Sequence, residues 1–205
     1  MAGGSSWATQ GKVLIVKLSK GRVDEDNATL LGAFLVTTIQ QAAMTRADVS
    51  EAERRDFHVY IDEFQNFTTS SLASILSEAR KYRLSLTIAH QYLKQLDVAT
   101  ADAVFGNVGS IIAFQVGTDD AEVLAEQLSK HPGQLPSQDL TNLPKYTAYA
   151  RLLIDGMPSH PFSMQTLSPP PITDDRLAIV TERSRRQHAQ SFEQVQAEIA
   201  SQWRA

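Results

Sequence analysis

Two kinds of segment follow each other along this chain: short runs of apolar residues, and longer segments in which apolar residues recur at helical spacing. This pattern predicts an α/β domain. Short apolar or β-branched runs that read as strands lie at Lys12–Leu18, Phe57–Ile61, Leu84–Ala89 and Gly109–Val116. Between them, apolar residues recur at helical spacing over Ala28–Arg46, Ser70–Tyr82, Ala99–Phe105 and Thr118–Leu128. Strands that alternate with helices in this way are typical of a largely parallel sheet flanked by helices.

The last third of the chain has a different pattern. Residues 146–154 and 161–167, joined through Asp155-Gly156, predict a terminal antiparallel β-hairpin. Ser168–Pro171 reads as a stiff spacer. Residues 174–203 predict one long polar helix with an apolar stripe. The predicted organisation is therefore a flexible leader (1–11), an α/β core (12–167), a proline-rich spacer (168–173) and a carboxyl-terminal helix (174–205).

Composition narrows the class of protein. The chain has 205 residues, no cysteine and a formal net charge of -4. The lack of cysteine excludes a disulfide framework, a thiolate zinc site and a cysteine nucleophile. Uninterrupted apolar runs are too short for a membrane span, and the start has no signal-peptide pattern, so we expect a soluble intracellular protein. Mild acidity gives no overall attraction to nucleic acid, so any such contact must be local.

Polar residues follow the predicted strands, and ligands bind beyond the carboxyl ends of parallel strands. Asp62-Glu63 comes directly after the strand Phe57–Ile61. An apolar strand followed by these two acids has the form of a Walker B element, in which the Asp holds hydrated Mg²⁺ and the Glu polarises the attacking water. The alternative is a strand-ending turn whose Asp caps a helix.

The next strand, Leu84–Ala89, is followed by His90-Gln91. An amide there could sense a γ-phosphate or orient the hydrolytic water, whereas the simpler interpretation is a surface Gln that begins a loop. His90 could serve as a base, although a lone His is more often structural. The helix between the two strands ends in basic residues, which either complement the helix dipole or supply an arginine to a phosphate across a subunit interface.

Four runs of the sequence resemble a known family. The runs KVLIVKLSKGRVDEDNATLLGAFL, FHVYIDEFQNF, LASILSEARKYRLSLTIAHQYLKQL and AVFGNVGSIIAFQVG are similar to the carboxyl-terminal half of the ATPase core of the HerA/FtsK superfamily. The resemblance is to its conjugative-transfer branch, the TraG/TraD-like coupling ATPases of type IV secretion. It extends from Lys12 to Leu167, and its specificity comes from IDEFQNF and SEARKYRLSLTIAHQY together.

The resemblance implies a RecA-like P-loop fold, a homo-hexameric ring and ATP-driven movement of DNA through a central pore. It implies that Asp62 binds Mg²⁺ through water, that Glu63 is the catalytic base and that Gln91 is the polar sensor. It makes Arg80 the candidate arginine finger acting in trans, with Lys81 and Arg83 as rivals. ATP and Mg²⁺ would be cofactors of the complete assembly. The location implied is cytoplasmic, at the inner face of the membrane through contact with membrane-associated secretion machinery.

One departure from the family is decisive for function. The motif G-x-x-x-x-G-K-[ST], whose amides and Lys hold the phosphates, does not occur in the sequence, and the only Gly-Lys pair, Gly11-Lys12, precedes a strand. In the implied fold, the strand that leads into the Walker A loop lies between Leu84–Ala89 and Gly109–Val116, so the predicted domain lacks a central strand and is incomplete. Either the chain is the downstream piece of a longer ATPase, or the two flanking strands close on each other. We adopt the first.

Two functions therefore follow as expectations. The first is part of a DNA-translocating ATPase that supplies Walker B and sensor residues and does not turn over ATP, or bind it tightly, by itself. The alternative is a non-enzymatic module for oligomerisation or partner binding, derived from such an ATPase. It depends on a helix stripe that would contact a partner or fold back on its own domain: Phe192, Val195, Ile199 and Trp203.

Overall fold

The computed structural model describes residues 13–18, 24–68, 70–129 and 134–202. Its internal contacts separate two compact units, residues 1–166 and residues 167–205, and each is described by itself. The predicted leader (residues 1–11) and Trp203 lie outside the described residues.

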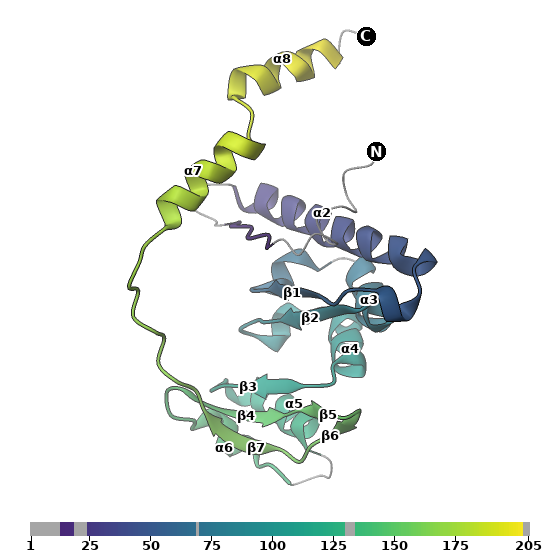
Figure 1. Ribbon diagram of the computed structural model, residues 1–205. Coiled ribbons are helices and arrows are strands. Elements are labelled where there is room, and N and C mark those ends of the chain that lie inside the picture. Colours follow the sequence, from purple (N-terminus) through teal and green to yellow (C-terminus); the bar gives the residue numbers. More distant parts are fainter. Residues whose placement is uncertain (1–12, 19–23, 69, 130–133, 203–205) are drawn as a thin grey trace. The chain divides into compact units, whose positions relative to one another are not determined.

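The first unit contains a parallel pair of strands, β1 (Phe57–Ile61) and β2 (Leu84–Ile88). Their register places Phe57 beside Leu84 and Ile61 beside Ile88. Side chains alternate, so one face packs into the core while His58 and Tyr60 remain exposed on the other. The pair therefore presents its two carboxyl ends, and the residues that follow them, side by side (Figure 1).

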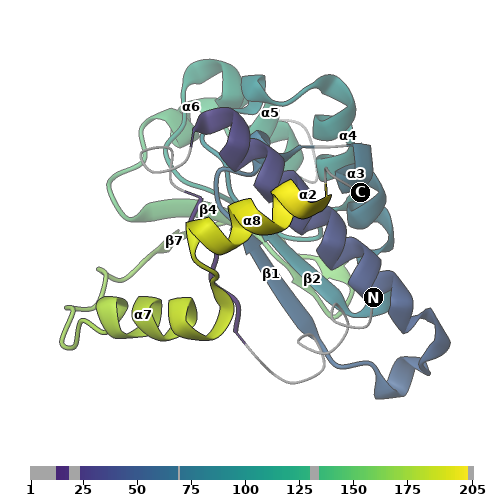
Figure 2. The same ribbon diagram turned by 90° about the horizontal axis from the view of Figure 1, so that it is seen from above.

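Helix α2 (Glu25–Met44) precedes β1 and packs through one stripe of its surface, and Figure 2 shows it running along the pair of strands. Buried Ala28, Gly32 and Val36 form its inner face, whereas Leu30 and Phe34 are more than half exposed on the outer one. The segment Glu25–Asp48 is long and apolar enough to cross a membrane by length and composition alone. Core-packing helices pass the same test, and the inner stripe of α2 does pack against the core.

Among the described residues, five 3-10 helices and two α-helices complete this half of the unit. The 3-10 segments η1 (Thr45–Asp48) and η2 (Glu51–Glu53) follow α2, and η3 (Phe64–Phe67) follows β1. Helix α3 (Ser70–Glu78) continues as η4 (Ala79–Tyr82) into β2, and η5 (Leu93–Gln95) leads to α4 (Val98–Asn107). Asp97 caps α4 by accepting a hydrogen bond from the Thr100 amide at 2.9 Å.

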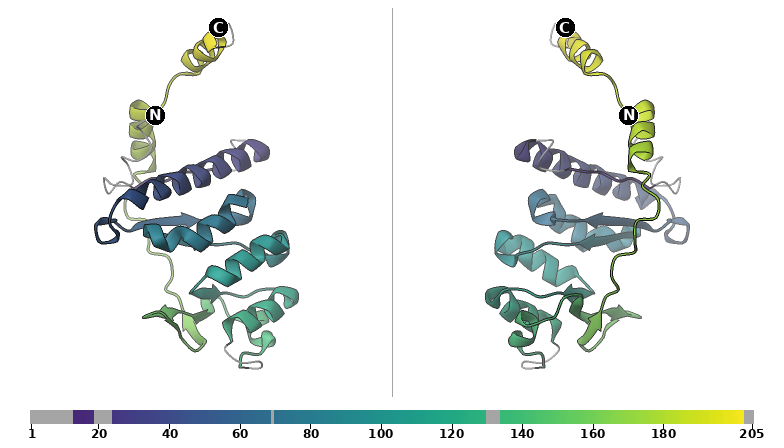
Figure 3. Two further views of the ribbon diagram at one scale, coloured as in Figure 1. Left: turned by 90° about the vertical axis from the view of Figure 1, so that its right-hand side faces the viewer. Right: turned by 90° about the vertical axis from the view of Figure 1, so that its left-hand side faces the viewer.

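A second sheet of three antiparallel strands forms the other half. Strand β3 (Ile111–Ala113) pairs with β4 (Thr147–Arg151), which pairs with β7 (Phe162–Gln165). The hairpin closes through β5 (Leu153–Ile154) and β6 (Met157–Pro158), and positive φ at Asp155 and Gly156 forms its tight turn. Helices α5 (Thr118–Leu128) and α6 (Ser137–Thr141) bury Ala121, Leu128 and Leu140 against this sheet (Figure 3). The predicted hairpin is thus confirmed, and α6 was not predicted.

The two sheets do not join. In the described part of the chain, β2 is hydrogen-bonded to β1 alone, and β3 to β4 alone. The expected alternative in which β2 and β3 close on each other is therefore wrong. The α/β class, with its small parallel sheet and terminal hairpin, is confirmed.

The strand predicted at Lys12–Leu18 does not form. Residues 13–18 have no regular structure, and Val13 and Ile15 are more than four-fifths exposed. A strand requires a partner for its backbone N–H and C=O groups, and no described strand pairs with this segment. Apolar, β-branched composition supplies a preference for extended backbone, but the preference alone does not make a sheet.

The second unit corrects the prediction of one long carboxyl-terminal helix. It contains α7 (Leu177–His188) and α8 (Phe192–Gln202), separated at residues 189–191. Ser191 Oγ accepts from the Gln194 amide at 3.2 Å, and Gln194 Oε1 accepts from the Ser191 amide at 3.1 Å. This reciprocal capping box starts a new helix, and the sequence Ser-Phe-Glu-Gln carries its signature. Phe192, Val195 and Ile199 of the predicted stripe are exposed on α8.

Candidate functional site

The candidate site lies where the two parallel strands end. Asp62-Glu63 follows β1, and His90-Gln91 follows β2 one residue after its end. Backbone hydrogen bonds continue the pairing past the strands, because the Ala89 amide donates to Ile61 O at 2.9 Å and the Phe64 amide donates to Ala89 O at 3.0 Å. The loops that carry the acids and the amide are therefore held in register with each other.

Glu63 has a left-handed backbone conformation, with φ 51° and ψ 44°. For a residue with a Cβ this conformation costs about 1–2 kcal/mol, and the next residue shows what holds it. Phe64 is 1% exposed and meets the ring of His90 edge-on, with ring centroids 5.0 Å apart. Burial of the Phe64 side chain thus turns the chain sharply after the strand and directs Glu63 away from the core.

Two amide groups bind the Glu63 carboxylate, one to each oxygen. Gln91 Nε2 donates to Glu63 Oε1 at 2.5 Å, and Gln65 Nε2 donates to Glu63 Oε2 at 2.6 Å. The structure therefore brings together two of the predicted site residues, Glu63 and Gln91, which follow the neighbouring strands β1 and β2. It adds Gln65, which sequence reasoning missed. Its position two residues after Glu63, in a tight turn, was the available signal.

Asp62 lies beside this group and is exposed. One of its oxygens, Oδ1, accepts a hydrogen bond from the Glu63 amide at 3.0 Å. Among the described residues, no group of three or more His, Asp or Glu side chains could hold a metal ion. An exposed single carboxylate fits Mg²⁺ that keeps most of its waters and takes its other ligands from a phosphate.

The loop after β2 is tied to the start of α5. Buried Asp120 accepts a hydrogen bond from the Leu93 amide at 3.1 Å through Oδ2, and exposed Lys94 pairs with Asp119. His90 lies in the same loop. Burial lowers the pKa of its imidazole, partly offset by a backbone hydrogen bond at Tyr92 and by the charges of Asp120 and Glu63. These contacts support the segment that carries Gln91 from both sides.

The candidate arginine finger is far from this group within one chain. Arg80 lies in η4, before the first residue of β2, whereas Gln91 follows the last one. Five strand residues at roughly 3.3 Å each separate the two ends. Arg80 is exposed and, in the part of the chain that the structure describes, has no ion pair or hydrogen-bond partner for its side chain. Its rival Arg83 pairs with Asp56 at 3.4 Å.

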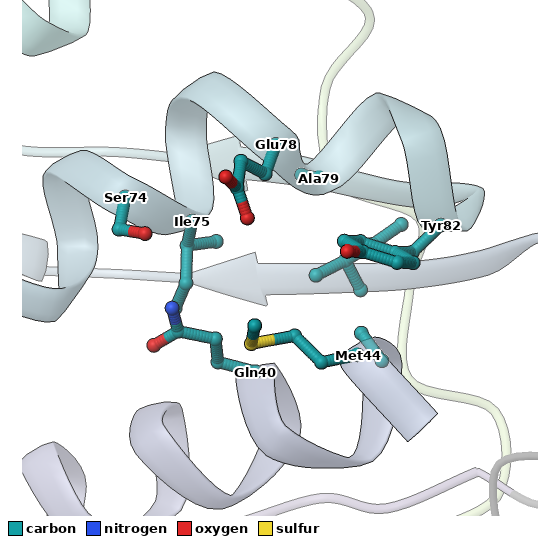
Figure 4. Close-up of a pocket in the computed structure, with 9 residues that line it drawn as sticks. Gln40, Met44, Ser74, Ile75, Glu78, Ala79 and Tyr82 are labelled. Atoms are coloured by element: carbon teal, nitrogen blue, oxygen red, sulfur yellow. The ribbon is translucent and has the colours of Figure 1, made fainter. Parts of the chain in front are cut away.

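A separate pocket lies between α2 and the α3–η4 segment (Figure 4). Its lining includes Gln40 and Met44 from α2 and Ile75, Glu78 and Tyr82 from the facing segment. The cavity measures about 10 Å³, which is close to the least that one water molecule needs. It is a packing gap and has no part in the candidate site.

Comparison with known proteins shows which families and structures this chain is similar to. Residues 56–140 match the family model described as the TraM recognition site of TraD and TraG. The fold is similar to the bacterial conjugative coupling protein TrwB in its unbound form, with a TM-score of 0.55, 17% sequence identity and coverage of 71% of this chain. The fold is also similar to a structure of plasmid coupling protein TrwB in complex with the non-hydrolysable GTP analogue GDPNP, with a TM-score of 0.53, 17% sequence identity and coverage of 71% of this chain.

VirB4 of Thermoanaerobacter pseudethanolicus matches with a TM-score of 0.47 and 13% identity over 69% of this chain and 39% of its own. No curated protein matches the sequence. The chain spans 40% and 39% of the length of the two TrwB chains. Over 71% of its length the chain thus has a fold similar to that of the coupling protein TrwB.

Proposed function

Because residues 56–140 match the family model of the TraM recognition site of TraD and TraG, we propose that this chain supplies the Walker B and sensor half of a conjugative DNA-translocating ATPase. The observation that carries the proposal is the contact between Glu63 and Gln91 across the carboxyl ends of β1 and β2. A carboxylate and an amide at neighbouring strand ends can hold a water molecule and a phosphate between them.

The proposed roles follow from the position of each residue. Asp62 would bind Mg²⁺ through water, Glu63 would take a proton from the attacking water and Gln91 would contact the γ-phosphate. A segment that bears the phosphate-binding loop would complete the site between β2 and β3, whose facing edges are not paired with each other in the described residues. When bound, ATP with Mg²⁺ would supply the phosphoryl group whose hydrolysis drives movement.

The proposal of a ring is supported by the position of Arg80 in η4, before β2. Because Arg80 lies at the opposite end of β2 from Gln91, it would reach a phosphate only from a neighbouring subunit. We propose a hexamer with DNA in its central pore, located in the cytoplasm at the inner face of the membrane beside secretion machinery. Arg83 pairs with Asp56, which favours Arg80 over Arg83 as the finger.

Phosphate release tests the proposal. The isolated chain at micromolar concentration should release no measurable phosphate, and the chain joined to a Walker A-bearing segment should do so. In the joined protein, Glu63→Gln should lower kcat by about 10²–10⁴-fold, while Glu122→Gln, an exposed acid on α5, should not. Robust turnover by the isolated chain, or full activity of the Glu63→Gln protein, would overturn the proposal.

A second candidate function is a partner-binding module. Phe192, Val195 and Ile199 are exposed on α8, at a spacing that suits helix-in-groove or coiled-coil contact. Substituting Phe192 and Trp203 with polar residues tests it. If the substituted chain no longer associates with itself or with a partner and its melting temperature is unchanged, this function is supported. A lower melting temperature would show that the helix stabilises its own domain instead.

A further inference from the structure

The Glu63 carboxylate is held by two amides that differ in how firmly they are themselves fixed. A carboxylate only accepts hydrogen bonds, so both Gln65 and Gln91 must present their NH₂ groups to it. The bonds measure 2.6 Å and 2.5 Å, and each carboxylate oxygen accepts one of them. We call Gln65, Glu63 and Gln91 the amide clamp.

Gln65 is the fixed arm of the clamp. It lies inside η3, and its backbone oxygen accepts from Thr68 Oγ1 at 3.3 Å. Its side chain is half-buried, and its Oε1 is buried without a hydrogen-bond partner in the structure. A buried carbonyl oxygen without a partner costs free energy, so the amide keeps this orientation because its NH₂ group is needed by Glu63.

Gln91 is the exchangeable arm. It is exposed and lies in the loop beyond β2, where a ligand at the strand ends would arrive. Its contact with Glu63 joins residues 28 positions apart, whereas Gln65 is two residues from Glu63 and moves with the same turn. A ligand that binds the Gln91 amide would therefore free Oε1 of Glu63 and leave Oε2 held.

We propose that Gln65 is a positioning residue for Glu63, and that it orients the carboxylate so that the oxygen released by Gln91 is the one that accepts a proton. The positioning role needs only the contacts in this chain, while the proton transfer rests on the proposed function. No covalent step is added, since Gln65 remains a hydrogen-bond donor throughout.

The side-chain NH₂ resonances of Gln65 and Gln91 in the ¹⁵N-labelled full chain test the clamp. Glu63→Gln, which removes the acceptor's charge, should move both pairs of resonances upfield. Gln91→Leu should leave the Gln65 pair in place, whereas Gln65→Leu should shift the Gln91 pair, because the carboxylate is then free to turn. Gln95→Leu, an exposed residue of η5, is the matched control and should move neither pair.

A Gln65 pair that does not respond to Glu63→Gln would overturn the proposal, as would a Gln91 pair that does not respond to Gln65→Leu. Should Gln65→Leu not fold, Gln65→Met, which keeps an unbranched side chain of similar length without the donor, serves in its place. Millimolar Mg·ATP, added to the protein joined to a Walker A segment, should move the Gln91 pair alone. Spectra unaltered by Mg·ATP, with the variant pattern intact, would count against the proposed function while supporting the positioning role.

Discussion

The ring of Phe67 occupies the space that a side chain on Gly32 would need. A Cβ built on Gly32 would lie 2.1 Å from Phe67 Cδ1, a distance that no two carbon atoms in non-bonded contact can adopt. Gly32 is on the inner stripe of α2, and Phe67 ends the η3 turn that begins directly after Glu63. This close approach therefore links the helix before β1 to the turn that carries the candidate site.

The exchange Gly32→Ala should destabilise the protein, although Ala is normally better than Gly in a helix by about 1 kcal/mol. Displacing the Phe67 ring is overpacking, which costs about 1–3 kcal/mol, and we expect a net loss in the free energy of unfolding by urea. Gly106→Ala in α4 is the matched control, because a Cβ there meets nothing within 4 Å. Equal effects at the two positions would contradict this account of the packing.

Loss of the Arg46 side chain should be strongly destabilising. Arg46 is 8% exposed, and its Nη1 donates to Arg55 O at 2.9 Å and to Tyr82 O at 3.2 Å. Burial lowers the pKa of its guanidinium, and these carbonyls compensate the charge. Arg46→Met should lower the free energy of unfolding by about 2–4 kcal/mol, since it leaves both carbonyls without a donor.

The control for Arg46→Met is Arg183→Met on exposed α7. It should change the free energy of unfolding by less than about 0.5 kcal/mol, as surface substitutions usually do. Denaturation in urea, followed by circular dichroism, gives both values. A cost for Arg46→Met that is no larger than the control's would show that the buried arginine is replaceable.

Stability should depend on pH through His90. Burial lowers the pKa of this imidazole, so the unfolded chain takes up the proton more readily than the folded one. The stability that the neutral imidazole contributes is fully present above a pH of about 6.5, the ordinary pKa of His. It is lost as the pH falls below that value. We expect the melting temperature to fall over that range, and His90→Phe, which keeps a ring against Phe64, to reduce the fall.

His188→Gln provides the comparison for His90, because His188 is exposed on α7. This variant should retain the wild-type dependence of melting temperature on pH. If His90→Phe retains it as well, groups other than His90 are responsible.

The break between α7 and α8 should depend on the capping box. Ser191→Ala removes the hydroxyl that accepts from the Gln194 amide, and helix caps of this kind contribute about 1 kcal/mol. We expect ¹³Cα chemical shifts in the first turn of α8 to move toward random coil, while those of α7 remain unchanged. Ser201→Ala, near the other end of α8, should leave that first turn intact, and loss of helix throughout α8 in this control would contradict the capping account.

Local spacing in the sequence predicted much of the architecture. Strand Phe57–Ile61 and helix Thr118–Leu128 have the predicted bounds, because the polar residues that limit each apolar pattern lie directly next to it in the sequence. The Asp-Gly turn of the hairpin was also predicted from the sequence, and both residues have the positive φ that this pair tolerates well. The capping box at Ser191 was also present in the sequence, and the helix prediction overlooked it.

Contacts between distant segments could not be predicted in this way. From the order of residues alone one can read that Asp62-Glu63 and Gln91 follow apolar, strand-like runs, and that the motif G-x-x-x-x-G-K-[ST] does not occur among the 205 residues. The folded chain was needed to show that Gln65 and Gln91 share the Glu63 carboxylate, and that residues 13–18 do not form a strand. Helices and turns satisfy their hydrogen bonds locally, whereas a strand or the amide clamp needs partners that the fold must bring from elsewhere in the chain.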